Sequence, residues 1–144
     1  MYFTIEGIPK ALKRHRHTTK GFTYDPSKKD KKDLLLQVMK YAPKPPITAP
    51  IRIMLIFYMP RPKSHFRTGK YKHLLKDEYI RKYPSYHTFT PDLDNLVKLV
   101  SDALNGVFYK DDSQICSIQA IKAYSNDLEW NNDHPRTEVE IEEI

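Results

Sequence analysis

The chain has 144 residues, of which 40% are hydrophobic, and it contains one cysteine. This length suits one domain with its own core, so we expect a single domain over residues 1–144, and the lone cysteine excludes a disulfide framework. The net charge is +6, but residues 1–125 hold 23 Lys and Arg against 11 acids, whereas residues 126–144 hold one Arg against seven acids. A body this basic attracts polyanions, and nucleic acid is the first candidate, although many solvated surfaces are also basic.

Several other classes of protein are excluded by composition. The longest apolar stretch, residues 53–60, is far too short to span a membrane, and the basic segment at residues 10–20 is not followed by the apolar run of a signal peptide. We therefore expect a cytoplasmic protein with no membrane partner and with Cys116 reduced. The six histidines are scattered and there are only four glycines, which disfavours a zinc site, a glycine-rich phosphate loop and a nucleotide cofactor.

The N-terminal third predicts a strand, a basic segment and a helix. Residues 1–8 alternate apolar and polar side chains like a strand, and residues 10–20 form a basic loop or arm. This arm is either a mobile solvated loop or a contact for DNA phosphates. Residues 24–27 resemble a turn and helix cap, and residues 28–41 suit a helix that ends before three prolines. The candidate DNA contacts of this region are Lys13, Arg14 and Arg16.

The middle of the chain predicts a buried strand and a long irregular segment. Residues 51–59 are nearly all apolar and fit a central strand covered on both faces. Residues 61–90 lack periodicity apart from a short helix expected around residues 74–82, and they mix cations with aromatic rings. Such a mixture suits phosphates and unstacked bases. The candidate DNA contacts here are Lys63, Arg67 and Lys70.

The last third predicts a helix and two strands. Apolar residues recur at helical spacing from Leu93 to Leu104, and Asn105-Gly106 ends the helix. Residues 115–124 and 137–144 are expected to be strands joined by a hairpin connection over residues 126–135. The predicted fold class is therefore α/β (α+β), with a mixed sheet of about four strands packed with two main helices in the order β-α-β-loop-α-β-β.

Acidic side chains gather around the second helix. Asp92 and Asp94 point the same way only if Asp92 lies on the extended entry or cap and Asp94 in the first turn, an arrangement that Pro91 favours. Asp111 and Asp112 follow in a polar turn. Carboxylates that share a small volume repel one another unless they are protonated or bridged by a cation, and Mg²⁺ or Mn²⁺ suits oxygen ligands.

A structural interpretation of the same residues also stands. Acids near a helix N-terminus complement the helix dipole, by about 0.3–1 kcal/mol each. Asp94 and Lys98 have the spacing of an ordinary ion pair on a helix surface, and residues 110–113 have the composition of an ordinary solvated turn. Spacing alone leaves the two interpretations evenly balanced.

Three motifs occur close together: Pro-Asp-Leu-Asp-Asn-Leu-Val-Lys at residues 91–98, Asp-Ala-Leu-Asn-Gly at 102–106 and Asp-Asp-Ser-Gln-Ile at 111–115. In combination they resemble the signature of the RusA-like Holliday-junction resolvases. The likeness extends to Tyr-Asp-Pro at 24–26 and Pro-Lys-Ser-His at 62–65. The resemblance implies an α/β fold with a mixed sheet and a homodimer. It also implies Mg²⁺-dependent endodeoxyribonuclease activity on branched DNA, with Mn²⁺ as a substitute, symmetric nicks across a four-way junction, and a phage or prophage context.

The resemblance also assigns roles by motif position. Asp92, Asp94 and Asp112 match the metal-binding acids and Lys98 the essential lysine, while the match of Asp111 is weaker. One departure is Thr-Phe-Thr at residues 88–90, where many relatives carry basic residues. We hypothesise that Phe89 stacks on or wedges between bases there. Two other functions stay open, a broader flap or fork nuclease and a non-catalytic DNA-architectural protein.

Overall fold

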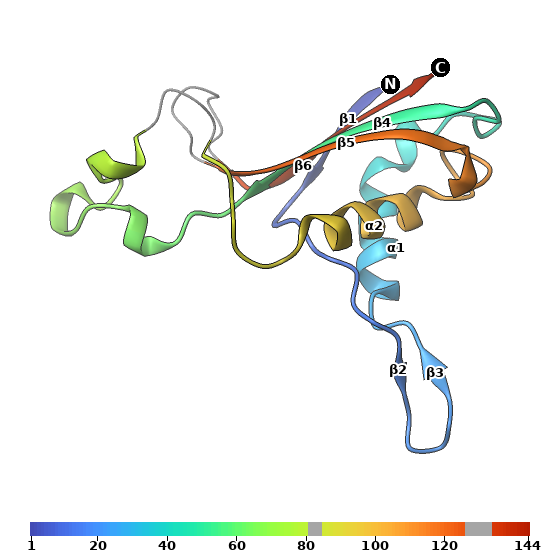
Figure 1. Cartoon of the computed structure of the whole chain (residues 1–144), viewed down its shortest axis with the longest axis horizontal. Helices are drawn as coiled ribbons and strands as arrows, with labels where there is room; N and C mark the ends of the chain where they lie inside the picture. Colours follow the sequence, from blue (N-terminus) through green and yellow to red (C-terminus); the bar gives the residue numbers. More distant parts are fainter. Residues whose placement is uncertain (81–84, 126–133) are drawn as a thin grey trace.

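The computed structural model of the chain describes residues 1–80, 85–125 and 134–144. Its main elements are a four-stranded sheet and two α-helices in the predicted order (Figure 1). The predicted α/β class with a mixed sheet of about four strands and two helices is confirmed. The strands of the sheet are β1 (Tyr2–Glu6), β4 (Ile51–Met59), β5 (Ile115–Tyr124) and β6 (Arg136–Glu143), and the helices are α1 (Lys28–Val38) and α2 (Leu93–Leu104).

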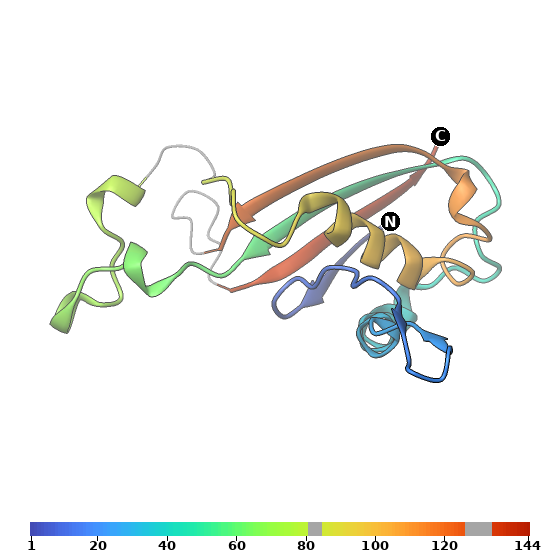
Figure 2. The same cartoon turned by 60° about the horizontal axis from the view of Figure 1, so that its bottom comes forward.

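The sheet has the strand order β1-β6-β4-β5 (Figure 2). β4 pairs in parallel with β5 and antiparallel with β6, and β1 pairs antiparallel with the other edge of β6. Because β4 separates β5 from β6, the prediction of a hairpin connection over residues 126–135 is wrong. A periodic pattern identifies a strand but not its neighbour, and here β6 pairs on the far side of β4. Residues 126–133 of the connection lie outside the described residues.

Both helices pack against the same face of the sheet (Figure 1). On β4 the alternate side chains from Ile51 to Met59 face the helices and are at most 3% exposed. The other face of β4 carries an exposed Arg52, half-buried Met54 and Ile56, and a buried Tyr58 that Arg136 covers. Among the described residues both helices lie on the first face, so the prediction that β4 is covered along both faces is wrong except at Tyr58. Its apolar second face reflects the central place of β4 between two paired strands, since Met54 and Ile56 lie opposite Glu140 and Glu138 of β6.

α1 begins just after the predicted turn and cap. Ser27 is fully buried, and its Oγ accepts a hydrogen bond from the N–H of Lys13 at 2.8 Å instead of capping α1. Its own N–H donates to Oδ1 of Asp25 at 2.9 Å, which closes the turn. A hydrogen bond from Lys31, followed by one from Ser27, holds the pKa of Asp25 below its usual range. The helix start is thus joined to the segment that precedes it.

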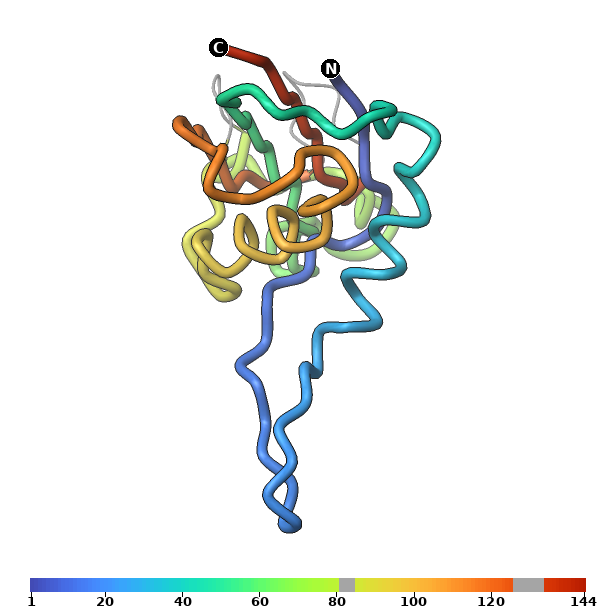
Figure 3. The backbone as a smooth tube through the Cα atoms, turned by 90° about the vertical axis from the view of Figure 1, so that its right-hand side faces the viewer, coloured from blue at the N-terminus to red at the C-terminus, as the bar shows by residue number. Residues whose placement is uncertain are grey.

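Residues 10–24, which we call the arm, form a short ribbon rather than a loop. β2 (Arg16–His17) pairs antiparallel with β3 (Thr23–Tyr24), and the N–H of Thr18 donates to the carbonyl of Phe22 at 2.7 Å. Gly21 makes the turn with a positive φ of 81°. The arm extends away from the sheet and helices (Figure 3). At its base, the N–H of Leu12 donates to the carbonyl of Asn95 at 2.9 Å, so the arm is tied to the first turn of α2.

Residues 60–80, which we call the projection, extend from the end of β4 (Figure 1). They contain short 3₁₀ helices at Lys63–His65, Gly69–Tyr71 and Asp77–Tyr79. Of the helix predicted around residues 74–82, the described part shows only the last of these, and residues 81 and 82 lie outside the described residues. The ring of His65 stacks on Tyr79 with centroids 3.9 Å apart and meets the edge of Tyr124 at 5.1 Å. These rings join the projection to the end of β5.

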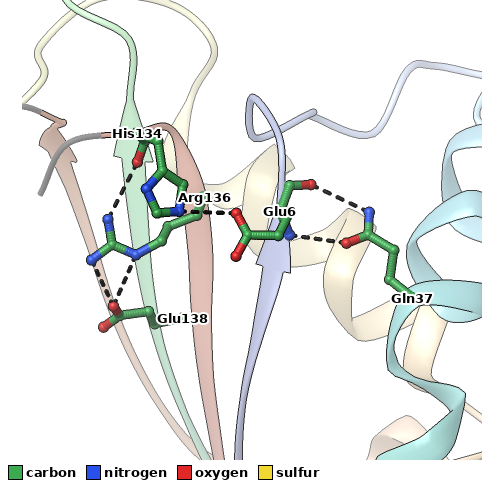
Figure 4. Close-up of polar contacts among 5 residues, drawn as sticks. All are labelled: Glu6, Gln37, His134, Arg136 and Glu138. Carbon is green, nitrogen blue, oxygen red and sulfur yellow. Dashed lines mark hydrogen bonds and ion pairs between the residues drawn. The ribbon is translucent and has the colours of Figure 1, made fainter.

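A polar network lies where β1 ends and β6 begins (Figure 4). Arg136 donates to Glu138 at 2.8 Å, and Nε2 of His134 lies 2.9 Å from Glu6. The side-chain amide of Gln37 on α1 accepts from the N–H of Glu6 at 2.9 Å and donates to its carbonyl at 3.3 Å. Gln37 thereby occupies backbone groups of an edge strand that another strand would otherwise use.

No helix in the described ranges has the length and apolar character needed to cross a membrane.

Candidate active site

The N-terminus of α2 has the conformation that the two aspartates require. Asp92 is the N-cap residue with extended backbone (φ −71°, ψ 144°), and Asp94 lies in the first turn. Both side chains are exposed. Within the described ranges no hydrogen bond or ion pair engages either carboxylate, and Asp92 makes no capping bond. The two carboxylates are therefore available to a ligand.

The rest of α2 anchors these residues in the core. Leu96 and Leu104 are fully buried, and Leu99 and Val100 are nearly so. The helix ends at Asn105, and Gly106 follows with a positive φ of 78°. The apolar stripe and the stop were both predicted, because helical spacing and an Asn-Gly pair are local features of the sequence.

An open groove of about 710 Å³ lies between α2 and β5. Its polar side chains come from three turns of one helix face and from the turn that precedes β5. Because residues four apart lie on the same side of a helix, Asp94, Lys98 and Asp102 enter this groove together. The lining residues are Leu93, Asp94, Val97, Lys98, Ser101, Asp102, Asp112, Ile115, Ile118 and Ala120.

The neighbouring acids Asp111 and Asp112 take different positions. Asp111 caps the 3₁₀ helix Asp112–Gln114, accepting from the N–H of Ser113 at 2.8 Å, while its own N–H donates to the side chain of Gln114 at 2.8 Å. Hydrogen bonds from Ser113 hold the pKa of Asp111 below its usual range. Asp112 lines the groove, whereas Asp111 is not among its lining residues. The geometry therefore favours Asp112 over Asp111 as a ligand.

The turn that carries these acids is fixed on both sides. Gln114 donates through Nε2 to the carbonyls of Ile47 at 3.0 Å and Ala49 at 2.8 Å. The buried hydroxyl of Tyr109 donates to the carbonyl of Ser101 on α2 at 2.7 Å. Burial, with a smaller effect of nearby carboxylates, raises the pKa of Tyr109 well above its usual value, so the hydroxyl remains a donor. Asp112 is thereby held at a set distance from α2.

Lys98 contacts Asp102, a motif residue to which the sequence interpretation gave no role in the site. Its Nζ lies 3.9 Å from Oδ1 of Asp102, and the two side chains are 61% and 25% exposed. The predicted pair of Asp94 with Lys98 is not formed in the described structure. The spacing of Asp94, Lys98 and Asp102 along one helix face was the sequence feature that could have identified Asp102.

The donor set suits a hard divalent cation, because all of its members are carboxylates. The described residues nevertheless contain no group of three or more His, Cys, Asp and Glu side chains that could hold a metal ion. Asp94 and Asp112 share the groove, while Asp92 is not among its lining residues. The shared site of Asp92, Asp94 and Asp112 thus stays a prediction.

Six of the predicted DNA contacts lie on the arm and the projection, and the seventh, Phe89, lies just before α2. Lys13, Arg14 and Arg16 are exposed on the arm. On the projection, Lys63 and Lys70 are exposed, whereas the guanidinium of Arg67 pairs with Asp77 at 2.8 Å. Phe89 lies just before α2 with 67% of its surface exposed. All seven side chains are on the surface, where a polyanion can reach them.

Comparison with known proteins identifies the family of the chain. The family model described as Endodeoxyribonuclease RusA matches residues 5–142. A protein of Bacillus subtilis (strain 168), described as "Uncharacterized protein YqaN", is 35% identical over 147 residues, which cover 99% of this chain and 95% of that protein. The matched region includes the arm, α2 and the turn before β5, and membership implies endodeoxyribonuclease activity. The chain belongs to the RusA endodeoxyribonuclease family.

Proposed function

We propose that this protein is a metal-dependent endodeoxyribonuclease that resolves Holliday junctions by paired, symmetric cuts during DNA recombination and repair. The observation that carries the proposal is the groove between α2 and β5. In a chain of the RusA family, this groove brings together Asp94 and Lys98 from α2 and Asp112 from a separate turn. Acids that can bind a divalent metal, with a lysine in the same open groove, suit metal-assisted hydrolysis of a phosphodiester.

Asp92, Asp94 and Asp112 are the proposed ligands of Mg²⁺, for which Mn²⁺ can substitute. When bound there, the metal lowers the pKa of a water molecule and neutralises charge on the phosphate oxygens. The protein contributes fixed directions of approach: Asp94 comes from a buried helix and Asp112 from a turn held by Gln114 and Tyr109. Asp111 is the weaker candidate because its carboxylate already caps that turn.

Lys98 is the proposed catalytic cation. Its ammonium enters the groove one turn after Asp94 and is 61% exposed, so it can approach a phosphate while Asp102 holds it from the next turn. A positive charge aimed at the scissile phosphate stabilises the negative charge that develops in the transition state.

The arm and the projection are the proposed DNA contacts. Between Gly7 and Tyr24 the chain carries five Lys and Arg and no acid. Lys13, Arg14 and Arg16 therefore lie in a segment whose Lys, Arg, Asp and Glu side chains are all positively charged. Lys63, Arg67 and Lys70 on the projection, with the exposed Phe89 before α2, complete the proposed contact. Phosphate contacts of this kind position the DNA without reading its sequence.

A homodimer gives the cuts their symmetry. Two identical grooves related by a two-fold axis match the near two-fold symmetry of a four-way junction. Paired cuts on opposite strands then follow from one reaction at each groove.

The test is cleavage of a synthetic mobile four-way junction, with the products mapped on all strands. We expect the wild type to make paired cuts only with Mg²⁺ or Mn²⁺, and Asp92→Asn to bind the junction without cutting it. Cleavage by Asp92→Asn at the wild-type rate would overturn the assignment. Equal cutting of flaps and forks would instead indicate the broader nuclease, and junction binding without any cleavage by the wild type would indicate an architectural protein.

A further inference from the structure

Lys122 on β5 donates two hydrogen bonds to the backbone that leads into α2. Its Nζ donates to the carbonyl of Phe89 and to the carbonyl of Pro91, and both distances are 2.6 Å. Hydrogen bonds from an ammonium are stronger than those between neutral groups. Pro91 directly precedes the N-cap residue Asp92, so the second of these bonds ends one residue from a proposed metal ligand.

The backbone of Lys122 holds the same segment at a third point. Its carbonyl accepts from the N–H of His87 at 3.0 Å, and Ser85 accepts from the N–H of Tyr124 at 2.9 Å. Residues 85–87 therefore run along the free edge of β5. After His87 the chain turns from the sheet toward α2, and the side chain of Lys122 follows it to Pro91.

The position of Lys122 relates these bonds to the groove. Side chains two apart on a strand point to the same face, and Ile118 and Ala120 both line the groove. Lys122 is the next residue in this series, so it lies just past the groove at the end where α2 begins. Its ammonium forms no ion pair within the described ranges, which leaves the two carbonyls as its polar partners there.

Water can replace much of what these bonds contribute to global stability. The bond to Phe89 is exposed and the one to Pro91 is only partly buried. Loss of the ammonium therefore leaves carbonyls that solvent can reach, while the backbone of residues 89–91 loses its restraint. The consequence of the contact is local order at the entry to α2.

We propose that Lys122 is a positioning residue that holds the backbone entering Asp92 and thereby limits the directions that the Asp92 carboxylate can take when it binds a metal. This inference rests on the proposed function, in which Asp92 is a metal ligand. It assigns Lys122 no contact with the metal or with the reacting phosphate.

The test compares Lys122→Met with Lys122→Arg, which keeps donors for both carbonyls, and with the control Lys32→Met, which removes an exposed charge from α1. Two quantities are measured in each protein, the Mn²⁺ concentration that gives half-maximal thermal stabilisation and the Mg²⁺ concentration that gives half-maximal junction cleavage. We expect Lys122→Met to raise both by about 10–100-fold, the range found when a residue that orients a ligand is lost. Lys122→Arg should recover most of this loss, and Lys32→Met should match the wild type.

Asp92→Asn distinguishes positioning from a general structural effect. If Lys122 acts through Asp92, adding Lys122→Met to Asp92→Asn should leave the Mn²⁺ midpoint where Asp92→Asn alone puts it. Additive effects would overturn the proposal. Should Lys122→Met fail to fold, Lys122→Gln, which loses the charge but keeps an amide NH₂ group, serves in its place.

Two other results would also contradict the proposal. An unchanged Mn²⁺ midpoint with weaker junction binding and a shallower salt dependence would make Lys122 a phosphate contact. An unchanged midpoint with unchanged binding would make it a local structural residue only. A wild type that fails to cut any junction removes the proposed function, but the Mn²⁺ measurement still reports whether Lys122 controls the site.

Discussion

In the groove, the side chains with proposed chemical roles come from elements held in the core, whereas in the arm they come from a ribbon that projects from it. α2 buries Leu96 and Leu104 completely, and the turn with Asp112 is fixed by Gln114 and Tyr109. The arm is held together by two pairs of residues and a short turn. Metal-assisted hydrolysis needs atoms placed to within a fraction of an ångström, whereas phosphate contacts tolerate movement. The difference suggests that the core supports the chemistry and the exposed segments capture DNA.

The largest effect that tests this comparison is expected at two adjacent acids, Asp111 and Asp112. We expect Asp112→Asn to lower junction cleavage by about 10²–10³-fold or more, because it removes a charge aimed at the reaction, while binding persists. Asp111→Asn should cleave much like the wild type, because an Asn oxygen can still accept from Ser113. Initial rates at saturating Mg²⁺ measure both. Equal losses would contradict the different positions of the two carboxylates.

The second prediction concerns the support of α2. Leu104→Ala should lower the free energy of unfolding by about 2–5 kcal/mol, because it leaves a cavity in the core beside the groove. Leu36→Ala, at a position 63% exposed on α1, is the matched control and should stay within about 0.5 kcal/mol of the wild type. Urea unfolding measures both. A small effect of Leu104→Ala would mean that α2 is not held by the core.

The third prediction concerns the arm. Replacing Arg14 and Arg16 by Gln should weaken junction binding and make the dependence of log K on log salt shallower by about 2, since each phosphate contact contributes about one unit. The cleavage rate at saturating DNA should not change, and Lys32→Gln provides the control. A lower rate at saturation would show that the arm takes part in the chemistry.

The smallest expected effect is a dependence of stability on pH. Burial lowers the pKa of His65 and of His87 in the folded protein, whereas in the unfolded chain each titrates near its ordinary value of about 6.5. Below that pH the unfolded state binds more protons, so this contribution to stability is complete above about pH 6.5 and declines as the pH falls. Thermal unfolding between neutral pH and about pH 5.5 should show the decline, and His65→Phe should reduce it. Replacing the exposed His73 by Phe should leave the decline unchanged. A stability that rises as the pH falls from neutral to about 5.5 would contradict the assignment.

Local patterns explain what could be predicted from the sequence. Three features depend only on neighbouring residues: the extended backbone of Asp92 at the start of α2, the apolar stripe of α2 and its stop at Gly106. The structure has all three. Asp94 and Asp112 line one groove because of the topology, and their common binding of a metal stays a prediction. Asp102 was given no role in the site although its spacing from Lys98 was visible.

Other features depend on contacts that no local pattern reveals. The hydrogen bonds from Lys122 to residues 89 and 91 form because residues 85–87 run beside β5, and no local sequence pattern predicts that pairing. The β2–β3 ribbon was missed because two-residue strands show no alternation. The apolar character of Met54 and Ile56 indicated burial, but it could not say whether a helix or only neighbouring strands would shield them.

The most direct measurement of the central claim is anomalous diffraction from crystals of the protein soaked in Mn²⁺. We expect an anomalous peak at the groove between α2 and β5, within coordination distance of Asp94 and Asp112 and with Asp92 turned toward it. A peak bound elsewhere, or a groove that stays without one while these carboxylates remain in solvent at saturating Mn²⁺, would contradict the account.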